Sequence, residues 1–428
     1  MFRALRSRNY QLFFMGQGVS LVGTWMQQTA MSWLIYRITG STLLLGAVAF
    51  FNQIPTLFLG PFAGVVADRW ERKRLLIWTQ ALSMLQAVIL ATLVLTNAIQ
   101  TWHILVLSAF IGIINAFDIP IRQSFVVQMV EKKEDLGNAI ALNSAMFNSA
   151  RFIGPSIAGI LISTVGEGVC FLLNGLSFIA VLASLIAIKV IPRQNHNGKA
   201  PVLHEFYEGI RYAYDFKPIF AMLVLLSVFA IAGAPYLVLM PAFAKDVLHG
   251  EAHTFGFLMS SAGIGALSAT MYLASRKNVN GLIRIIPLAT ASCGLGIIAF
   301  ALSRNIALSI ACLFLAGFAM MIQIASSNTI IQTIVDEDKR GRIMSLYAMS
   351  FMGVMPFGSI VAGSVADRIG VQNTLLLGAA LCIVGASIFA AKLPTLCSDL
   401  KSAFAHLEIC RTEKPEGEPF EMGRERSR

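Results

Sequence analysis

Long apolar segments recur along the whole chain, and most are separated by short polar turns. A helix that crosses a membrane needs about 20 mostly apolar residues. The pattern predicts twelve such helices, at residues 12–36, 43–67, 75–96, 102–128, 139–164, 168–190, 219–244, 253–275, 282–302, 306–332, 343–366 and 372–391. The chain is therefore predicted to be an all-α integral membrane protein.

One long polar connection divides the predicted helices into two sets of six. We expect a first six-helix bundle at 1–190, a cytoplasmic linker at 191–218, a second six-helix bundle at 219–392 and a polar tail at 393–428. The tail is predicted either to lie on the membrane as a short amphipathic helix or to be disordered. The loops leave no room for a separate soluble domain.

The two halves share small residues at matching places. The pairs Gly154/Gly358, Ala158/Ala362 and Gly159/Gly363 are each 204 positions apart. They fall in the fifth and eleventh predicted helices, which occupy the same place in each half. A parallel repeat of this kind favours two bundles with a substrate site between them, near the middle of the membrane.

The charges are distributed unevenly between the two sides of the membrane. Only 13% of residues are charged, against about 25% in soluble domains. Of the 33 Lys and Arg residues, 27 fall in the N-terminal segment, the loops on its side and the tail, and four fall in the opposite loops. Lys and Arg favour the cytoplasmic side. We expect both termini in the cytoplasm of a multi-pass bacterial inner-membrane protein. This placement explains the net charge of +10 without nucleic acid.

The residue types needed for catalysis or for a metal site are not clustered. The six cysteines are scattered, and the six histidines fall in loops or at helix ends. No phosphate-binding glycine loop ending in Gly-Lys-Ser/Thr occurs. We expect no enzyme activity, no cofactor and no metal.

The loop between the second and third helices carries a motif. Residues 64–74 read "GVVADRWERKR". The stretch resembles the signature of the major facilitator superfamily, a glycine, three residues, Asp, Arg and then a basic cluster. The matching residues are Gly64, Asp68, Arg69, Arg72 and Lys73. The usual glycine before the basic pair is absent, and Trp70 and Glu71 stand in the turn. The resemblance implies an inner gate in which Asp68 faces the start of the eleventh helix, near Gly341 and Arg342.

Further stretches extend the resemblance over residues 8–391. "RFIGPSIAG" (151–159) is similar to the glycine-proline signature of the superfamily's antiporters and exporters, without its upstream glycines. "GTWMQQTAMSWLIYRITGS" (23–41) and "NQIPTLFLGPFAGVVADRWERKR" (52–74) resemble bacterial exporters of the enterobactin-exporter-like and multidrug branches. The resemblance implies the major facilitator fold, with 12 transmembrane helices in two six-helix bundles.

Asp118 is the one acidic residue, of 23, that lies well inside a predicted membrane helix. A charge at the centre of a bilayer costs at least ~2.5 kcal/mol unless it is paired or hydrated. Arg122 lies one turn away on the same helix. Arg151 lies at a similar depth on the next helix, roughly 20 Å from the inner face. Asp118 with Arg122 and Arg151 therefore forms either a static ion pair or a charge network that couples protons to transport.

Other polar and aromatic side chains inside the helices are candidates for lining a substrate cavity. Trp25, Phe50 and Phe51 offer aromatic rings for stacking. The remaining candidates are Gln27, Gln28, Trp33, Asn52, Asn143, Asn148, Gln323 and Asn328.

Together these features predict a secondary active transporter. We expect it to export a small amphipathic or aromatic molecule, such as a drug, siderophore or metabolite, by alternating access. Protons are the expected coupling ion, and the expected unit is a monomer in the lipid bilayer. The alternative is a translocase of lysophospholipid or another lipid with the same fold.

Overall fold

The computed structural model describes residues 3–130, 133–189, 210–276, 279, 281–336 and 339–403. The side chains of residues 61, 64, 65, 67–69, 133 and 401–403 lie outside this description. Within these limits the chain forms helices and turns, and the described ranges contain no strand.

The first half contains six long helices. They are α1 (Arg8–Thr39), α2 (Thr42–Arg69), α3 (Arg72–Leu95), α4 (Thr101–Met129), α5 (Leu136–Val165) and α6 (Glu167–Ala187). Short 3-10 turns precede two of them, η1 (Arg3–Arg6) before α1 and η2 (Lys133–Asp135) before α5. Each long helix begins and ends within four residues of its predicted limits.

The second half also crosses six times, but two of its crossings are broken into shorter pieces. The seventh consists of α8 (Lys217–Val228), η3 (Phe229–Gly233), α9 (Tyr236–Ala242) and η4 (Phe243–Val247). The eleventh consists of α13 (Arg340–Ala348), η5 (Met349–Gly353) and α14 (Met355–Ile369). The continuous helices are α10 (Ala252–Ser275), α11 (Leu282–Leu302), α12 (Ile306–Ile334) and α15 (Val371–Ala403).

Eleven of these crossings are long and apolar enough to span a membrane, which supports the predicted membrane fold. The twelfth is α1, which has 32 residues and packs along α5 and α6. Several side-chain amides lower its hydropathy, at Asn9, Gln11, Gln17, Gln27 and Gln28. Its length of about 48 Å exceeds the thickness of a bilayer.

The structure differs from the predicted limits at the polar segments. Helix α15 continues to Ala403, so the first part of the predicted tail extends the last helix. Residues 210–215, within the predicted linker, are helical. The rest of the linker through residue 209, and the tail after residue 403, lie outside the described residues.

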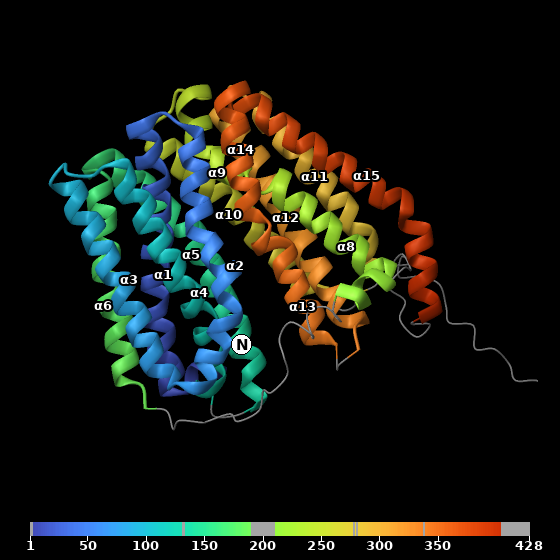
Figure 1. Cartoon of the computed structure of the whole chain (residues 1–428), viewed down its shortest axis with the longest axis horizontal. Helices are drawn as coiled ribbons and strands as arrows, with labels where there is room; N and C mark the ends of the chain where they lie inside the picture. The colour runs from blue at the N-terminus through green and yellow to red at the C-terminus, as the bar shows by residue number, and fades with distance from the viewer. Residues whose placement is uncertain are drawn as a thin grey trace, which may run out of the picture.

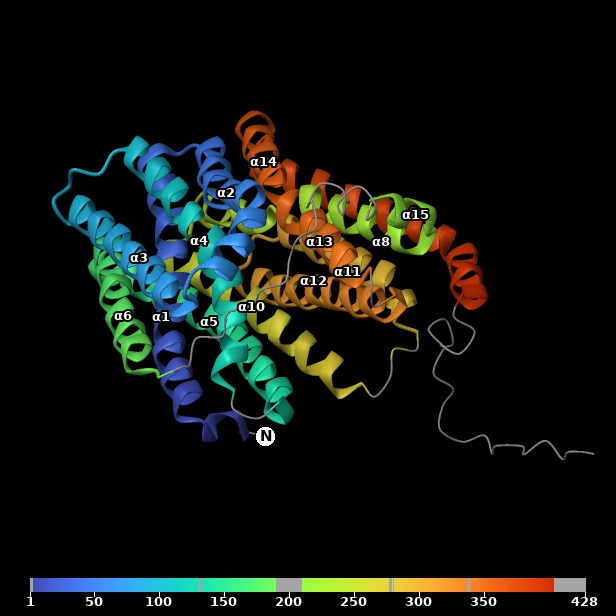
Figure 2. The same cartoon turned by 60° about the horizontal axis from the view of Figure 1, so that its bottom comes forward.

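The two sets of helices lie side by side as two bundles (Figure 1). The bundles meet at the end that holds the α1–α2 turn, which we name the closed end. They diverge toward the end that holds the first residues of α1, which we name the divergent end (Figures 1 and 2). Within the described part of the chain, two lengthwise seams join the bundles, α5 against α10 and α2 against α14.

The apolar core follows the same division. At the closed end a single buried cluster draws residues from both bundles, including Trp33 and Tyr36 from the first and Phe243 and Phe255 from the second. Toward the divergent end each bundle has its own cluster, around Phe13 and Phe125 in the first bundle. A separate cluster in the second bundle contains Ile219 and Ile331. Among the described residues, the bundles therefore share a core at the closed end and have separate cores toward the divergent end.

A close glycine contact lies in each seam. A Cβ on Gly159 would lie 2.9 Å from the Cα of Gly256, and a Cβ on Gly363 would lie 3.1 Å from the Cα of Gly46. Gly159 and Gly363 are one of the pairs spaced by 204 positions. Gly159 joins the fifth crossing to the eighth, and Gly363 joins the eleventh crossing to the second. These equivalent contacts agree with a repeated architecture. Only residues without side chains allow backbones to approach this closely.

Candidate functional site

The turn between α1 and α2 places several polar groups at the closed end. Gly40 ends α1 in a left-handed conformation (φ 63°), which a glycine adopts without strain. Ser41 then caps α2, and its hydroxyl hydrogen-bonds Asp367 of the other bundle at 3.4 Å. The Thr42 hydroxyl donates to the carbonyl oxygen of Gly363 at 3.0 Å. These two hydrogen bonds therefore join the α1–α2 turn of the first bundle to α14 of the second.

A second set of contacts joins α1 to the seventh crossing at the closed end. The phenol of Tyr36 donates a hydrogen bond to the carboxylate of Asp246. The ammonium group of Lys245 lies 5.6 Å from the centroid of the Tyr36 ring, within cation–π range. No role for Tyr36, Lys245 or Asp246 was apparent from the sequence. In the structure these three residues join the two bundles.

Aromatic rings fill the seams next to these polar contacts. Trp33 stacks on Phe255 with ring centroids 6.0 Å apart and planes 16° apart. Phe50 packs edge-on against Phe357 at 5.9 Å. Trp33 is 7% exposed, so in this state it closes the seam and does not line an accessible cavity.

Asp118 lies inside the first bundle and faces α3. Its Oδ1 accepts hydrogen bonds from the Thr79 hydroxyl and the Gln80 amide, each at 2.7 Å, and its Oδ2 is ion-paired with Arg122. The carboxylate is 2% exposed. Of the two partners that sequence reasoning left open, the structure selects Arg122. Helix α4 packs mainly against α2 and α3, which keeps Asp118 away from Arg151 on α5.

Arg151 has different surroundings. Its guanidinium lies over the ring of Trp25 on α1, 5.7 Å from the centroid. Trp25 packs edge-on against Phe147, also at 5.7 Å. Among the described residues Arg151 makes no ion pair or hydrogen bond through its side chain. Of the three charged residues singled out in the sequence, Asp118 and Arg122 are in contact, and Arg151 instead contacts Trp25.

Gln27, a candidate for lining the cavity, makes its hydrogen bonds inside the first bundle in this state. Its amide donates to Gln86 on α3 and accepts from Asn174 on α6, both at 2.8 Å. The side chains of Gln27, Gln86 and Asn174 are all buried within the first bundle. Their mutual hydrogen bonds satisfy the amides and join three helices.

The other polar candidates are in mixed surroundings. Gln28 is exposed, and Asn52, Asn143 and Asn328 are partly exposed. Asn148 is 9% exposed and donates to the carbonyl oxygen of Ser144. Gln323 is fully buried, and neither atom of its amide group has a hydrogen-bond partner in the structure. Helical periodicity indicated the depth of these residues but not the direction in which they point.

Part of the inner-gate motif can be placed. The side chains of Gly64, Asp68 and Arg69 lie outside the described residues. Arg72 begins α3. Lys73 donates to the carbonyl oxygens of Ile186 at 3.2 Å and Ile188 at 2.6 Å. Lys73 therefore neutralises the negative C-terminal end of α6, which is a structural role.

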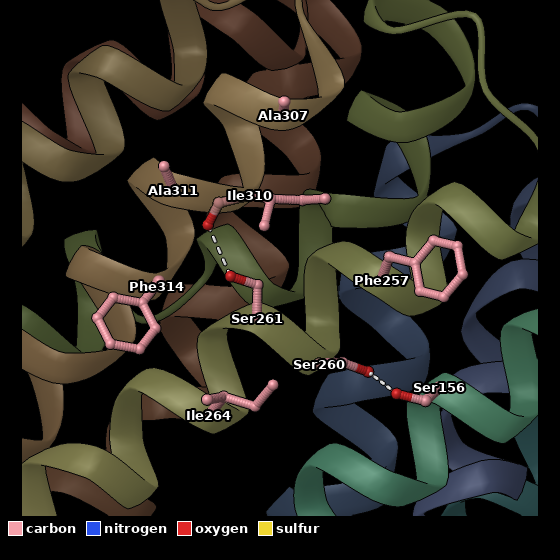
Figure 3. Close-up of a pocket in the computed structure, with 9 residues that line it drawn as sticks. All are labelled: Ser156, Phe257, Ser260, Ser261, Ile264, Ala307, Ile310, Ala311 and Phe314. Atoms are coloured by element: carbon pink, nitrogen blue, oxygen red, sulfur yellow. Dashed lines mark hydrogen bonds between the residues drawn. The ribbon is translucent and has the colours of Figure 1, made fainter.

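A pocket of about 600 Å³ lies beside the seam between α5, α10 and α12. Phe257, Ile264 and Phe314 lie along it (Figure 3). Its hydroxyl groups already have partners: Ser156 hydrogen-bonds Ser260 across the bundles at 2.6 Å, and Ser261 donates to the carbonyl oxygen of Ile310 (Figure 3). The pocket therefore suits an apolar chain better than a polar ligand.

Comparison with known proteins agrees with this architecture. The chain is 26% identical to the staphyloferrin A transporter of Staphylococcus aureus over 85% of its own length and 90% of that protein. It is 23% identical to macrolide efflux protein A of Streptococcus pyogenes, covering 86% and 92%. A solved structure of a bacterial homolog of the human lysosomal transporter Spinster, in an inward-facing and unoccupied conformation, has a TM-score of 0.69 at 14% identity, covering 92% and 98%.

The family described as transmembrane secretion effector matches residues 1–412, nearly the whole chain. Both sequence relatives are transporters by name, and the fold is shared with the solved transporter. The two bundles, the seams between them and this match lead to one assignment. The chain belongs to the transmembrane secretion effector family of major facilitator superfamily transporters.

Proposed function

We propose that this protein exports a small amphipathic or aromatic molecule from the bacterial cytoplasm by alternating access, and that this structure is its inward-open state. The observation that carries the proposal is the shared apolar core at the closed end, with separate cores at the divergent end. Such an arrangement exposes the space between the bundles to one side of the membrane. The names of the relatives, a siderophore transporter and a macrolide efflux protein, support this class of cargo.

The charge distribution supports the orientation. The divergent end holds the basic N-terminal segment and the basic stretch at the start of α3. Because Lys and Arg favour the cytoplasmic side, the divergent end faces the cytoplasm in this proposal. Both termini then lie in the cytoplasm, and the α1–α2 turn faces outward.

We assign the coupling role to Asp118. Its two oxygens accept two hydrogen bonds and one ion pair in this state, so a proton on the carboxylate would weaken its pairing with Arg122. A proton antiporter that faces inward has released its proton and awaits substrate. In the opposite state the protonated acid would release Arg122, which links proton entry to a rearrangement of the first bundle.

The experiment is uptake of an amphipathic aromatic dye, Hoechst 33342, into inverted membrane vesicles with an acidic interior. The expected result is dye accumulation that stops when the pH gradient is collapsed and is abolished in Asp118→Asn. Thr79→Val removes one donor to the same carboxylate without removing the acid, and should reduce accumulation without abolishing it. Accumulation that persists without the gradient would contradict proton coupling, and no accumulation of any tested amphipathic molecule would contradict export.

The apolar pocket favours a second candidate, a lipid translocase of the same fold. The pocket opens beside the α5–α10 seam, where a lipid tail would reach it from the bilayer. A dithionite assay on proteoliposomes with fluorescent lysophospholipid distinguishes the two functions. Translocation faster than in protein-free liposomes, and lost in Ser260→Phe, would favour the lipid function over drug export.

A further inference from the structure

Arg151 is a cation without a counter-ion in the described protein. It lies on α5, 14 residues before the end of that helix at Val165, which places it about 21 Å from the closed end. A guanidinium at this depth is costly unless it is paired or hydrated. The partner that the protein supplies is the face of Trp25, which offers a weak attraction and no hydrogen-bond acceptor.

The location of Arg151 makes it reachable from between the bundles. Three successive contacts join α5 to α10, at Gly159, Ser156 and Phe152, where Phe152 lies against Gly263. Arg151 immediately precedes Phe152 in the chain, on the side of these contacts toward the divergent end of α5. Its side chain is only partly buried. The guanidinium therefore lies next to the α5–α10 seam, over the ring of Trp25.

The opposite bundle presents a second group without a partner. Tyr236 on α9 is 1% exposed, and its hydroxyl has no hydrogen-bond partner in the structure. Helix α9, which carries Tyr236, contacts α1, the helix of Trp25, and also α10. A buried phenol without a partner is unfavourable, and a suitable acceptor would recover that loss.

We propose that Arg151 binds an acidic group of the transported molecule, so that the substrate is an aromatic or amphipathic carboxylate. The carboxylate pairs with the guanidinium and, as the bundles close around it, accepts a hydrogen bond from Tyr236. The rings of Trp25 and Phe147 flank the apolar part of the same molecule. This inference rests on the proposed export function and specifies the chemical class of its cargo.

The test uses the full-length protein in lipid nanodiscs and needs neither a gradient nor turnover. The probe is 4-nitrobenzoate, an aromatic carboxylate that quenches tryptophan fluorescence, with neutral 4-nitrobenzamide as the matched compound. The Trp25 signal is the difference between wild type and Trp25→Phe. We expect saturable quenching of Trp25, with the carboxylate bound about tenfold more tightly than the amide, equivalent to about 1.4 kcal/mol.

Substitutions then assign the preference to Arg151. Arg151→Gln should reduce the preference for the carboxylate to less than about twofold, and Arg151→Lys should restore part of it. Arg368→Gln, which changes an exposed arginine at the closed end, should leave the preference unchanged. Equal binding of the two probes, no saturable quenching, or a preference that survives Arg151→Gln would overturn the proposal.

The outcome is separable from that of the export assay. Selective binding that depends on Arg151, together with no transport of any compound, would reject export and keep the acid site. Export of Hoechst 33342, which has no carboxylate, at an unchanged rate in Arg151→Gln would keep export and reject the acid as a required feature of the substrate.

Discussion

The phenol of Tyr36 on α1 donates a hydrogen bond to the carboxylate of Asp246 on η4, so the first and seventh crossings are joined at the closed end. This bond links the two bundles and must break when that end opens. An interaction shifts a conformational equilibrium only by the difference between its strengths in the two states. The Tyr36–Asp246 bond therefore specifically stabilises the state in which the closed end is shut, which we propose to be inward-open.

Tyr36→Phe should move the population toward the outward-open state by up to about tenfold, if about 1.4 kcal/mol is lost. Double electron–electron resonance between spin labels at Ala98 and Ile306, one on each bundle at the closed end, measures the change. Tyr10→Phe is the matched control, because the Tyr10 hydroxyl bonds the carbonyl oxygen of Ala139 within a single bundle. The same population shift in both variants would show that loss of the Tyr36–Asp246 bond is not its cause.

The α5–α10 seam should not tolerate a larger residue at Gly159. A Cβ there would lie 2.9 Å from the Cα of Gly256 and 3.0 Å from the carbonyl oxygen of Ala252, both backbone atoms that cannot rotate away. Gly159→Ala should open the closed end and slow export several-fold in the vesicle assay. Gly137→Ala on the same helix meets open space and should behave as wild type. If Gly159→Ala transports normally, the seam is looser than its contacts indicate.

Arg122→Ala should destabilise the first bundle by about 2 kcal/mol, because it leaves the Asp118 carboxylate buried with two neutral donors. The change is measured as a lowered unfolding temperature in detergent. The double variant Asp118→Asn/Arg122→Ala, compared with each of its single variants, should recover much of this loss, since it removes both charges together. If the two single losses simply add in the double variant, the ion pair contributes little to stability.

Asp68→Asn should favour the inward-open state if the Asp68 carboxylate faces the positive end of α13, as the resemblance of its motif implies. A carboxylate at a helix N-terminus contributes typically 0.3–1 kcal/mol, and up to about 2 when partly buried. Spin labels at Glu134 and Ser345 report the separation at the divergent end. An unchanged distance distribution together with intact export would mean that Asp68 is a solvated loop acid.

The orientation is tested by cysteine labelling in intact cells. A membrane-impermeant maleimide should label His249→Cys, near the closed end, and should miss Asn197→Cys in the linker. The variants are made in a chain whose six native cysteines are replaced by alanine. Labelling at 197 would reverse the assignment of the two faces.

Hydropathy predicted the helices well because each crossing must be apolar over a bilayer's thickness. Hydropathy could not reveal which way a side chain points, since each residue turns the helix by about 100°. Gln27 and Gln28 are adjacent in sequence, yet Gln27 is buried among amides inside one bundle and Gln28 is exposed. The same limit left the partner of Asp118 undecided between Arg122 and Arg151.

No sequence signal distinguished Tyr36 and Asp246, whose hydrogen bond joins the bundles at the closed end, from ordinary loop residues. Tyr36 and Asp246 are 210 positions apart, and each stands near the end of an apolar segment. Their contact depends on how the two bundles meet, which no local pattern reports. The glycine pairs were the part of the seam that the internal repeat did indicate.

The π-turns give the two halves different mechanical properties. Each π-turn widens a helix by inserting a residue into its regular hydrogen-bonding pattern. Among the described helices these turns fall at η3, η4 and η5, in the seventh and eleventh crossings of the second half. The first half has continuous helices, three of them joined through Gln27. We therefore expect any bending during transport to concentrate in the seventh and eleventh crossings, so that the two repeated halves contribute unequally.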